Sequence, residues 1–305
     1  MGLAPIVLFV YNRFDHTRRT VQALQNNVLA KDSKLIIYAD AAKNFEAEGQ
    51  VTAVRDYLKT IDGFLAVDIR LRDTNLGFNQ NIITGVSEVV NEYEKIIVVE
   101  DDLVTSKWFL SYMNDALERY EQDNKVACIH GYLLPVKRQL KEAFFLKGAD
   151  CWGWATWKRA WDLFEEDAAV LLSEIKTRGL QYEFEFNGTY PYVKMLEGEG
   201  TGKNASWDVR WYASAFLQNK LTLYPGTSLV NNIGHDNSGS NCGETQTYEV
   251  SIGQNKVDVN AVVEVDEEAY GAIAEFFSTM SSQDARKKSW LSRSFKRLKL
   301  SIKQK

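Results

Sequence analysis

The sequence is poor in cysteine, and its cysteines are widely spaced. Cys128, Cys151 and Cys242 are odd in number and form no C-x-x-C pair. A disulfide framework or a structural zinc site needs more thiols at closer and regular spacing. We therefore expect a protein of a reducing cytoplasm, with neither structural disulfides nor zinc.

Long apolar runs are also lacking. None approaches the roughly 18 residues that a membrane-spanning helix needs, and the run from Leu3 to Tyr11 is interrupted by Pro5. The start has no basic segment followed by a small-residue cleavage site, so no secretory signal is predicted. We expect a cytoplasmic location, with at most a peripheral attachment to the inner face of the cytoplasmic membrane.

Two common glycine-rich phosphate loops are missing. The sequence contains neither the Walker A pattern nor Gly-x-Gly-x-x-Gly. These loops hold phosphate groups through backbone N–H groups in many nucleotide-binding enzymes. A phosphate bound here is therefore expected to be held through a metal ion, and kinase or dehydrogenase chemistry is not expected.

Charge is distributed unevenly along the 305 residues. The net charge is −5, but residues 286–305 hold nine Lys or Arg and no acid, which leaves −14 for residues 1–285. An acidic body argues against nucleic-acid binding. With 45% hydrophobic residues, that body is large enough to bury a substantial core.

The basic tail, residues 286–305, has an amphipathic pattern. Leu291, Phe295, Leu298 and Ile302 fall on one helical face, with basic residues around it. Such a helix suits an anionic membrane surface, where each basic residue contributes about 1 kcal/mol. A frayed, solvated terminus is the alternative. A lipid-linked acceptor would explain why this tail binds a membrane.

Strand and helix patterns alternate in the first half of the chain. Aliphatic runs at 5–10, 34–39, 67–71 and 95–99 are each followed by a helical pattern, at about 15–26, 46–59, 78–93 and 107–121, with Asp15 as the expected first N-cap. Four such units predict an α/β fold with a mostly parallel sheet and helical crossovers. The second half is less regular and is expected to continue the same domain.

The acidic triplet Glu100-Asp101-Asp102 ends the most apolar of these runs. In open α/β sheets, ligands bind beyond the carboxyl ends of the strands. Three adjacent acids repel one another unless a cation or hydrogen bonds compensate. A divalent cation carrying a phosphorylated ligand is therefore the favoured interpretation, and a solvated acidic turn before the next helix is the alternative.

Arg13 and Asp40 follow two other strands and are expected at the same edge of the sheet. A carboxylate such as Asp40 can accept from a base N–H or a ribose hydroxyl, and Arg13 can stack on a base or offset phosphate charge. In the alternative interpretation Asp40 caps a loop and Arg13 is its ion-pair partner. Together with the acidic triplet, the two residues favour a nucleotide site.

Tryptophans recur at helical spacing at positions 154, 157 and 161. This spacing first indicates a packed core face. Aromatic faces also stack on sugar C–H surfaces, so Trp152 or Trp154 is a candidate acceptor platform. Trp154, at the entrance of the expected helix, is the preferred of the two.

The order of these features resembles the GT-A glycosyltransferases, and within them the N-acetylglucosaminyltransferase I family. The resemblance covers about residues 5–240. It rests on the strands before Arg13 and Asp40, on Ile97–Leu103 with its acidic motif, and on Gly153-Trp154 and Trp207-Asp208. The acidic strand is the most specific of these matches.

The resemblance implies a donor site for a nucleotide sugar. It places Arg13 and Asp40 on the uracil of a UDP-sugar, Glu100 and Asp101 on the sugar and ribose, and Asp102 on Mn²⁺ or Mg²⁺. Some GT-A enzymes use a late histidine as a further metal or diphosphate ligand, which makes His235 a candidate. An exposed loop histidine, or one bonded to Asp236, is the alternative.

The resemblance also implies that Asp208 is the base that deprotonates the acceptor hydroxyl, with inversion at the anomeric carbon. An alcohol with a pKa near ~16 is a poor nucleophile until a carboxylate accepts its proton. In the alternative interpretation Asp208 caps the helix expected over residues 207–219.

Taken together, the sequence predicts a GT-A domain over residues 1–285, with a nucleotide-sugar half (1–132) and an acceptor half (133–285), followed by the basic tail. The expected activity is metal-dependent, inverting transfer from a nucleotide sugar, such as UDP-GlcNAc, to a glycan or lipid-linked saccharide in surface polysaccharide biosynthesis. The alternatives are a sugar nucleotidyltransferase and a non-catalytic glycan-binding protein.

Overall fold

The computed structural model describes residues 2–199, 206–239 and 244–280. The basic tail, residues 286–305, and Cys242 lie outside these ranges. The predictions made for them stay predictions. No helix among the described residues is both long and apolar enough to cross a membrane.

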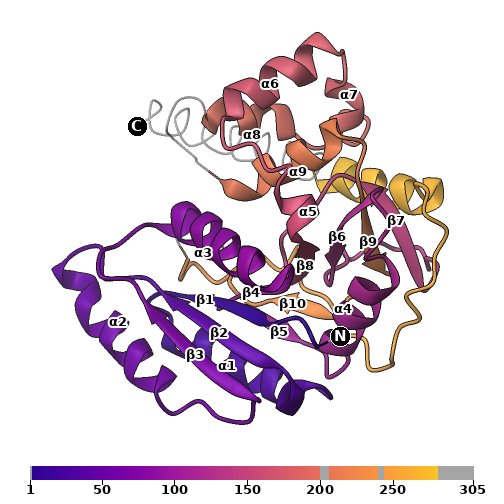
Figure 1. Cartoon of the computed structure of the whole chain (residues 1–305). Helices are drawn as coiled ribbons and strands as arrows, with labels where there is room; N and C mark the ends of the chain where they lie inside the picture. Colours follow the sequence, from indigo (N-terminus) through magenta and orange to yellow (C-terminus); the bar gives the residue numbers. More distant parts are fainter. Residues whose placement is uncertain (1, 200–205, 240–243, 281–305) are drawn as a thin grey trace, which may run out of the picture.

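An eight-stranded sheet forms the centre of the molecule (Figure 1). Its order is β3-β2-β1-β4-β8-β6-β9-β7. The strands are Ile6–Val10 (β1), Lys34–Ala39 (β2), Ala66–Leu71 (β3), Lys95–Glu100 (β4), Val126–His130 (β6), Ala143–Lys147 (β7), Trp154–Trp157 (β8) and Leu221–Pro225 (β9). Only β8 and β7 run antiparallel to their neighbours in this sheet. The sheet is therefore mostly parallel.

Helices cover both faces of the sheet. They are Phe14–Gln25 (α1), Phe45–Leu58 (α2), Phe78–Tyr93 (α3), Phe109–Arg119 (α4), Lys158–Trp161 (α5), Ala168–Thr177 (α6), Gln181–Phe184 (α7), Tyr192–Glu199 (α8), Trp207–Leu217 (α9) and 267–280, with a 3₁₀ turn at Ala30–Asp32 (η1). Core residues of α1, α2 and α4 cluster with one face of the strands, and those of α3, α5 and α9 with the other. Figure 1 shows α1 and α3 on opposite faces. The predicted α/β class is confirmed.

The predicted strand and helix units of the first half are confirmed with small shifts at their ends. Ile96 to Val99 are fully buried, as expected for a strand covered on both faces. β3 is an edge strand with partly exposed residues. Asp15 is not the N-cap of α1: Arg13 occupies that position, and its side chain makes no capping hydrogen bond.

A second, two-stranded antiparallel ribbon is not predicted by the sequence. It pairs Leu103–Thr105 (β5) with Val230–Asn232 (β10), and Leu103 lies opposite Asn232. Each strand has three residues, too few to show an alternating pattern. The ribbon joins the segment after the acidic triplet to the segment before His235.

The segment from Trp154 to Trp157 is a strand, so the helix predicted from the spacing of these two tryptophans is wrong. Side chains alternate across a strand, and these two residues belong to core clusters on opposite faces of the sheet. Pairing of β8 with β4 and β6 outweighs the local pattern, and the helix begins only at Lys158. The predicted core position of Trp157 and Trp161 is confirmed.

Trp154 is fully buried, which corrects its predicted role as an acceptor platform. Its ring stacks on Trp207 at 5.5 Å between centroids and packs beside Trp161 and Trp211. A side chain with 0% exposure has no face left for a saccharide. Trp154 is therefore a core residue.

Replacing Trp154 by Ala is expected to lower the free energy of unfolding by about 3 to 5 kcal/mol, the usual cost of removing a buried large aromatic side chain. Urea denaturation measures this loss. Trp152→Ala is the matched comparison, because Trp152 is only half-buried, and its loss is expected to be smaller. Equal losses in the two variants would contradict the assignment.

Candidate active site

The carboxyl ends of β1, β2 and β4 meet at one edge of the sheet. β1 lies between β2 and β4, with Val10 opposite Ala39 and Phe9 opposite Glu100. The chain connects β1 to β2 on one side and returns to β4 on the other, which makes this edge a topological switch point, where ligands bind in open α/β sheets. The predicted gathering of Arg13, Asp40 and the acidic triplet at one edge is therefore realised.

Arg13 is paired with the acidic triplet. Its Nη2 donates to Oδ1 of Asp101 and, at 2.8 Å, to Oδ2 of Asp102. Both carboxylates are buried, and the Arg13 side chain is 18% exposed. The guanidinium offsets the repulsion between the neighbouring acids. Because Asp101 and Asp102 are buried and paired with Arg13, the alternative of a solvated acidic turn is wrong.

Asp40 organises a loop. Its Oδ1 accepts from the N–H groups of Ala41 and Leu76, and its Oδ2 from Gly77 N and Asn75 Nδ2, all at 2.9 to 3.0 Å. Asp40 is 4% exposed, and both oxygens are fully used. The geometry favours the loop-cap interpretation over the contact to uracil. The predicted ion pair between Asp40 and Arg13 is not formed, because Arg13 binds Asp101 and Asp102 instead.

Two buried polar atoms lie at the centre of the site without a hydrogen-bond partner. Within residues 2–199, 206–239 and 244–280, neither Asp102 Oδ1 nor His235 Nε2 has one. The charge of Asp102 reaches His235, whose pKa is nonetheless lowered by burial. The imidazole is therefore neutral, with a lone pair available for a cation.

The loop that carries His235 is fixed at several points. Ile233 N donates to Asp102 O at 2.8 Å, and His16 Nε2 lies 3.3 Å from Ile233 O. The His235 ring stacks on Tyr248, with centroids 5.0 Å apart. Asp236 lies 3.2 Å from His16 Nε2. The alternative bond from His235 to Asp236 is therefore not formed, and His235 is half-buried.

The donor set at this point is small. Among the described residues, no three His, Cys, Asp or Glu side chains converge on one point. Mg²⁺ and related cations usually take one or two protein ligands and complete their shell with water and substrate phosphates. Asp102 and His235 fit a cation of that kind, and they do not form a closed structural metal cage.

Gly234 is required for the close approach of this loop to Asp102. A Cβ atom at Gly234 would lie 2.1 Å from Asp102 Oδ2 and 3.1 Å from Arg13 Nη1. Gly234→Ala is therefore expected to displace the carboxylate and weaken Mn²⁺ binding by at least about tenfold, or ~1.4 kcal/mol, measured by the paramagnetic resonance of free Mn²⁺.

Gly49→Ala is the control for that variant, since a Cβ at Gly49 meets nothing within 4 Å. It lies in α2 and is expected to leave Mn²⁺ affinity unchanged. If Gly234→Ala also left the Mn²⁺ affinity unchanged, Asp102 would no longer be a candidate metal ligand.

Asp208 lies in the first turn of α9. Its Oδ1 accepts from Ser206 Oγ and from Val209 N, and Cys151 Sγ lies 3.8 Å from its Oδ2. Burial raises the pKa of Asp208, and the hydrogen bond from Ser206 opposes this. Ser206 is the N-cap residue, so Asp208 is not. A carboxylate with a raised pKa is suited to accept a proton.

Glu100 connects the two ends of the site. Burial raises its pKa well above the usual range, and the charges of Asp102, Asp208 and Asp101 add to this. Burial also raises the pKa of Asp101 to about 6, against the opposing charge of Arg13. Glu100 is therefore within electrostatic range of the candidate metal ligand on one side and of the candidate base on the other.

Trp152, the other predicted acceptor platform, is half-buried and packs against Tyr132 at 4.8 Å and His235 at 5.4 Å. Two other residues of the site are missed by sequence reasoning. Tyr248 and Asp150 carry no sequence motif. Their partners come from distant segments, so no local pattern could identify them.

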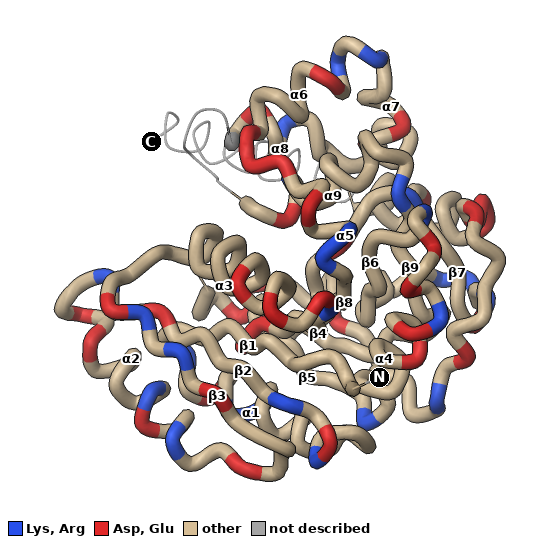
Figure 2. Tube along the Cα trace, viewed as in Figure 1, with Lys and Arg blue, Asp and Glu red and all other residues tan. Residues whose placement is uncertain are grey.

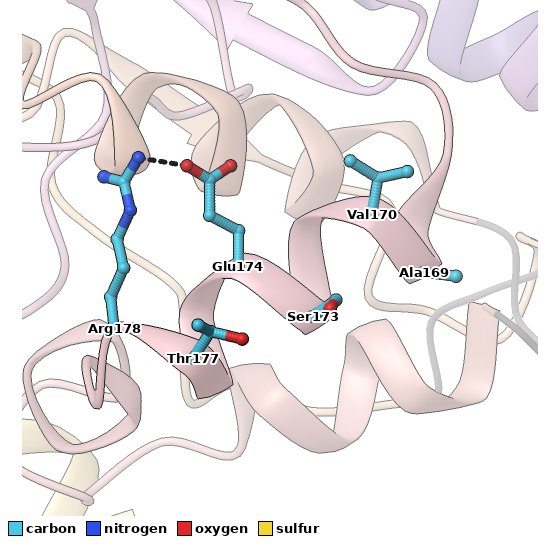
Figure 3. Close-up of a pocket in the computed structure, with 6 residues that line it drawn as sticks. All are labelled: Ala169, Val170, Ser173, Glu174, Thr177 and Arg178. Atoms are coloured by element: carbon cyan, nitrogen blue, oxygen red, sulfur yellow. Dashed lines mark hydrogen bonds and ion pairs between the residues drawn. The ribbon is translucent and has the colours of Figure 1, made fainter.

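A shallow groove elsewhere on the surface has different chemistry (Figure 3). It runs along α6, and its Glu174 is paired with Arg178. Its other lining residues are Ala169, Val170, Ser173 and Thr177. None of the unpartnered buried polar atoms of the described chain belongs to it. The sheet edge is therefore the better candidate site.

No protein-family model and no curated protein matches the sequence. Among solved structures, the chain is similar to residues 1–349 of S. aureus TarS, with a TM-score of 0.43 and 11% identity over 75% of this chain and 60% of that one. It is also similar to the mannosyltransferase PcManGT from Pyrobaculum calidifontis, solved in complex with GDP-Man and Mn²⁺, with a TM-score of 0.33 and 14% identity over 43% of this chain and 35% of that one.

The matched part of this chain spans less than two thirds of each of those two structures. The sequence comparisons give no support for a specific relationship to the N-acetylglucosaminyltransferase I family. That finer resemblance therefore stays a prediction.

Proposed function

We propose that this protein is a metal-dependent, inverting glycosyltransferase that uses a nucleotide sugar. The observation that carries the proposal is the pair of buried, unpartnered atoms, Asp102 Oδ1 and His235 Nε2, at the switch point of a mostly parallel sheet. Asp208, with its raised pKa, lies within electrostatic range of Glu100 at the same edge. A cation site and a proton acceptor flank one strand end.

On the donor side, Asp102 and His235 would hold Mn²⁺ or Mg²⁺. When bound, such an ion neutralises the negative charge of the leaving nucleotide diphosphate. Arg13 keeps Asp101 and Asp102 in place and adds a fixed positive charge. The assignment to a UDP-sugar such as UDP-GlcNAc, with Glu100 and Asp101 on the sugar and ribose, follows from the resemblance to the N-acetylglucosaminyltransferase I family.

On the acceptor side, Asp208 would take the proton of the attacking hydroxyl. Ser206 and Val209 N bind one of its oxygens and leave the other, Oδ2, facing Cys151. Attack from the face opposite the leaving group in a single displacement inverts the anomeric carbon. The acceptor is a glycan or a lipid-linked saccharide, and the basic tail offers a route to a membrane surface.

A thermal-shift screen of nucleotide sugars with and without Mn²⁺ tests this function. A ligand at about 100 times its Kd raises the free energy of unfolding by about 2.7 kcal/mol. We expect such a shift only when a nucleotide sugar and Mn²⁺ are present together. A shift with nucleotide sugar that is indifferent to EDTA would rule out the metal site.

Donor turnover separates the enzyme from its alternatives. A glycosyltransferase releases nucleoside diphosphate and forms a product of inverted anomeric configuration, which NMR identifies. A glycan-binding protein releases none. A sugar nucleotidyltransferase would instead release pyrophosphate from a nucleoside triphosphate and a sugar phosphate.

The pH dependence of transfer is expected to report Asp208. A base must be ionised, and burial raises the pKa of this carboxyl, so activity is full above the raised pKa and falls as the pH falls through it. We expect the acid limb of kcat/KM for the acceptor, at saturating donor, to lie above the value of about 4 for an ordinary Asp. A limb at or below that value would contradict the role of Asp208.

The same shift has the opposite sign for stability. A carboxyl with a raised pKa in the folded state favours its protonated form there, so its contribution to the free energy of unfolding declines as the pH rises. In Asp208→Asn, the free energy of unfolding is expected to decline less steeply as the pH rises.

A further inference from the structure

Five half-buried side chains lie near the candidate base, Asp208, which is itself half-buried. Three are aromatic and two are carboxylates: Trp152, Tyr190, Tyr248, Glu100 and Asp150. Trp152 and Tyr248 pack edge to face at 5.7 Å, and a hydrogen bond joins Tyr190 to Tyr248. We call Trp152, Tyr190 and Tyr248 the aromatic wall. Trp154 and Trp207 are fully buried, whereas the three side chains of the wall keep part of their surface exposed and open to a ligand.

The charge around this wall is negative. Burial is the main cause of the raised pKa of Tyr190, and the charges of Asp208 and Asp150 add to it. The same two carboxylates and Glu100 raise the pKa of the Cys151 thiol beyond the effect of burial. Asp150 also raises the pKa of Asp208. Asp150, Asp208 and Glu100 therefore lie within electrostatic range of the same neighbouring groups.

The basic groups near this space are engaged elsewhere. Arg13 is bound to Asp101 and Asp102 on the donor side. Arg210 donates to the backbone oxygens of Ser206 and Glu166. Burial lowers the pKa of His130, which leaves its ring neutral. His235 packs against Trp152 and Tyr248, and burial lowers its pKa as well, so its ring is also neutral. None of these four side chains offers a free positive charge to a negative group at the wall.

Asp150 is the carboxylate best placed to meet a ligand. Its side chain is 41% exposed, although its partners are buried: its Oδ2 accepts from Tyr224 OH at 3.2 Å and lies 3.5 Å from His130 Nδ1. His130 is 1% exposed, and within the described chain its Nδ1 makes no hydrogen bond. Its Nε2 accepts from Trp152 N at 3.1 Å. A buried, unpartnered nitrogen thus points to the carboxylate at the foot of the wall.

We propose that the aromatic wall and Asp150 select an acceptor whose terminal sugar is uncharged or carries an amine, and exclude one with an acidic terminal sugar. This rests on the function proposed above and assigns its acceptor class. A pyranose can stack its C–H face on Trp152 or Tyr248 and donate its hydroxyls to the carboxylates. An ammonium gains a charge-assisted bond. A carboxylate or phosphate on that sugar faces like charges and meets no free basic group among residues 2–199, 206–239 and 244–280.

Three phenyl β-glycosides that differ only in charge test the proposal: the glucoside, the 2-amino-2-deoxyglucoside and the glucuronide. Their Kd values are measured by calorimetric titration of the full chain with UDP and Mn²⁺ present. We expect the glucuronide to bind at least about tenfold more weakly than the glucoside, a discrimination that salt reduces. The amino sugar is expected to bind as tightly as the glucoside or more tightly.

Asp150→Asn is the diagnostic variant, and Asp115→Asn is its matched control, a carboxylate on α4 that is also half-buried and is paired with Lys256. Asp150→Asn is expected to lower the ratio of the Kd of the glucuronide to the Kd of the amino sugar by about tenfold. Asp115→Asn is expected to leave this ratio unchanged. Near-equal binding of the three glycosides, binding of none of them, or an unchanged preference in Asp150→Asn would each overturn the proposal.

The failure of this inference is distinguishable from the failure of the proposed function. Stabilisation by a nucleotide sugar with Mn²⁺ is measured without any glycoside and tests only the donor site. If it is present while the three glycosides bind equally, the acceptor class alone is wrong. If it is absent while the glycosides are discriminated, the wall is a saccharide site on a protein that is not this enzyme.

Discussion

Replacing Asp102 by Asn is expected to abolish the Mn²⁺-dependent binding of a nucleotide diphosphate and to lower transfer by about a thousandfold. A bound cation contributes several kcal/mol to the stabilisation of charge in the transition state, and about 4 kcal/mol corresponds to that factor. Asn keeps the shape of the side chain but removes the charge beside His235. Arg13 retains its bond to Asp101, so the fold at this edge is preserved.

Paramagnetic resonance of free Mn²⁺ and thermal shift with UDP measure the effect in that variant. Asp162→Asn is the control, since this exposed carboxylate directly after α5 pairs only with Lys158 among the described residues. Affinity for Mn²⁺ and UDP within about threefold of the parent, a difference of under ~0.7 kcal/mol, would exclude Asp102 as a ligand.

Replacing Asp208 by Asn is expected to lower kcat by about 10² to 10⁴-fold, the usual contribution of a positioned general base. The amide can accept a hydrogen bond but cannot take the proton. Donor binding is expected to be unchanged, because Asp208 lies on the acceptor side, beside Cys151 and Ser206.

Single-turnover rates at saturating donor, together with thermal shift by donor and Mn²⁺, separate the chemical step from binding in Asp208→Asn. Asp56→Asn provides the comparison, as an exposed carboxylate of α2 bound to Lys59. A kcat within about threefold of the parent would mean that another group accepts the proton. A lost donor shift would mean that the variant disturbs the donor site instead.

Much of the first half of the fold follows from the sequence. Ile96 to Val99 are apolar on both faces of a strand, so they must lie inside a sheet that is covered on both sides. Parallel strands place their carboxyl ends together, which is why Arg13, Asp40 and the acidic triplet could be assigned to one edge without knowing the strand order. Lys and Arg are interspersed with Asp and Glu over the described chain (Figure 2), and no pattern of charge alone marks that edge.

The second half shows where local pattern is overridden. Trp154 and Trp157 are spaced for a helix, but hydrogen bonding to β4 and β6 makes their segment a strand and places them on opposite faces. Asp40 shows the same limit in another form. Its residue type and its position suit a ligand, and only the loop of Asn75 to Gly77, folded against it, shows that its oxygens are already used.

The sequence by itself determined the alternating strands and helices, the edge at which they end, and the acids placed there, because these depend on hydrophobic periodicity and on the direction of the chain. Only the tertiary structure decided which groups meet. Asp102 and His235 are brought together by a ribbon of two three-residue strands. Trp152 and Tyr248 pack together from separate segments, and the charge of Asp150 reaches Asp208 on α9. Such contacts depend on long-range packing, for which no stretch of sequence carries a local signal.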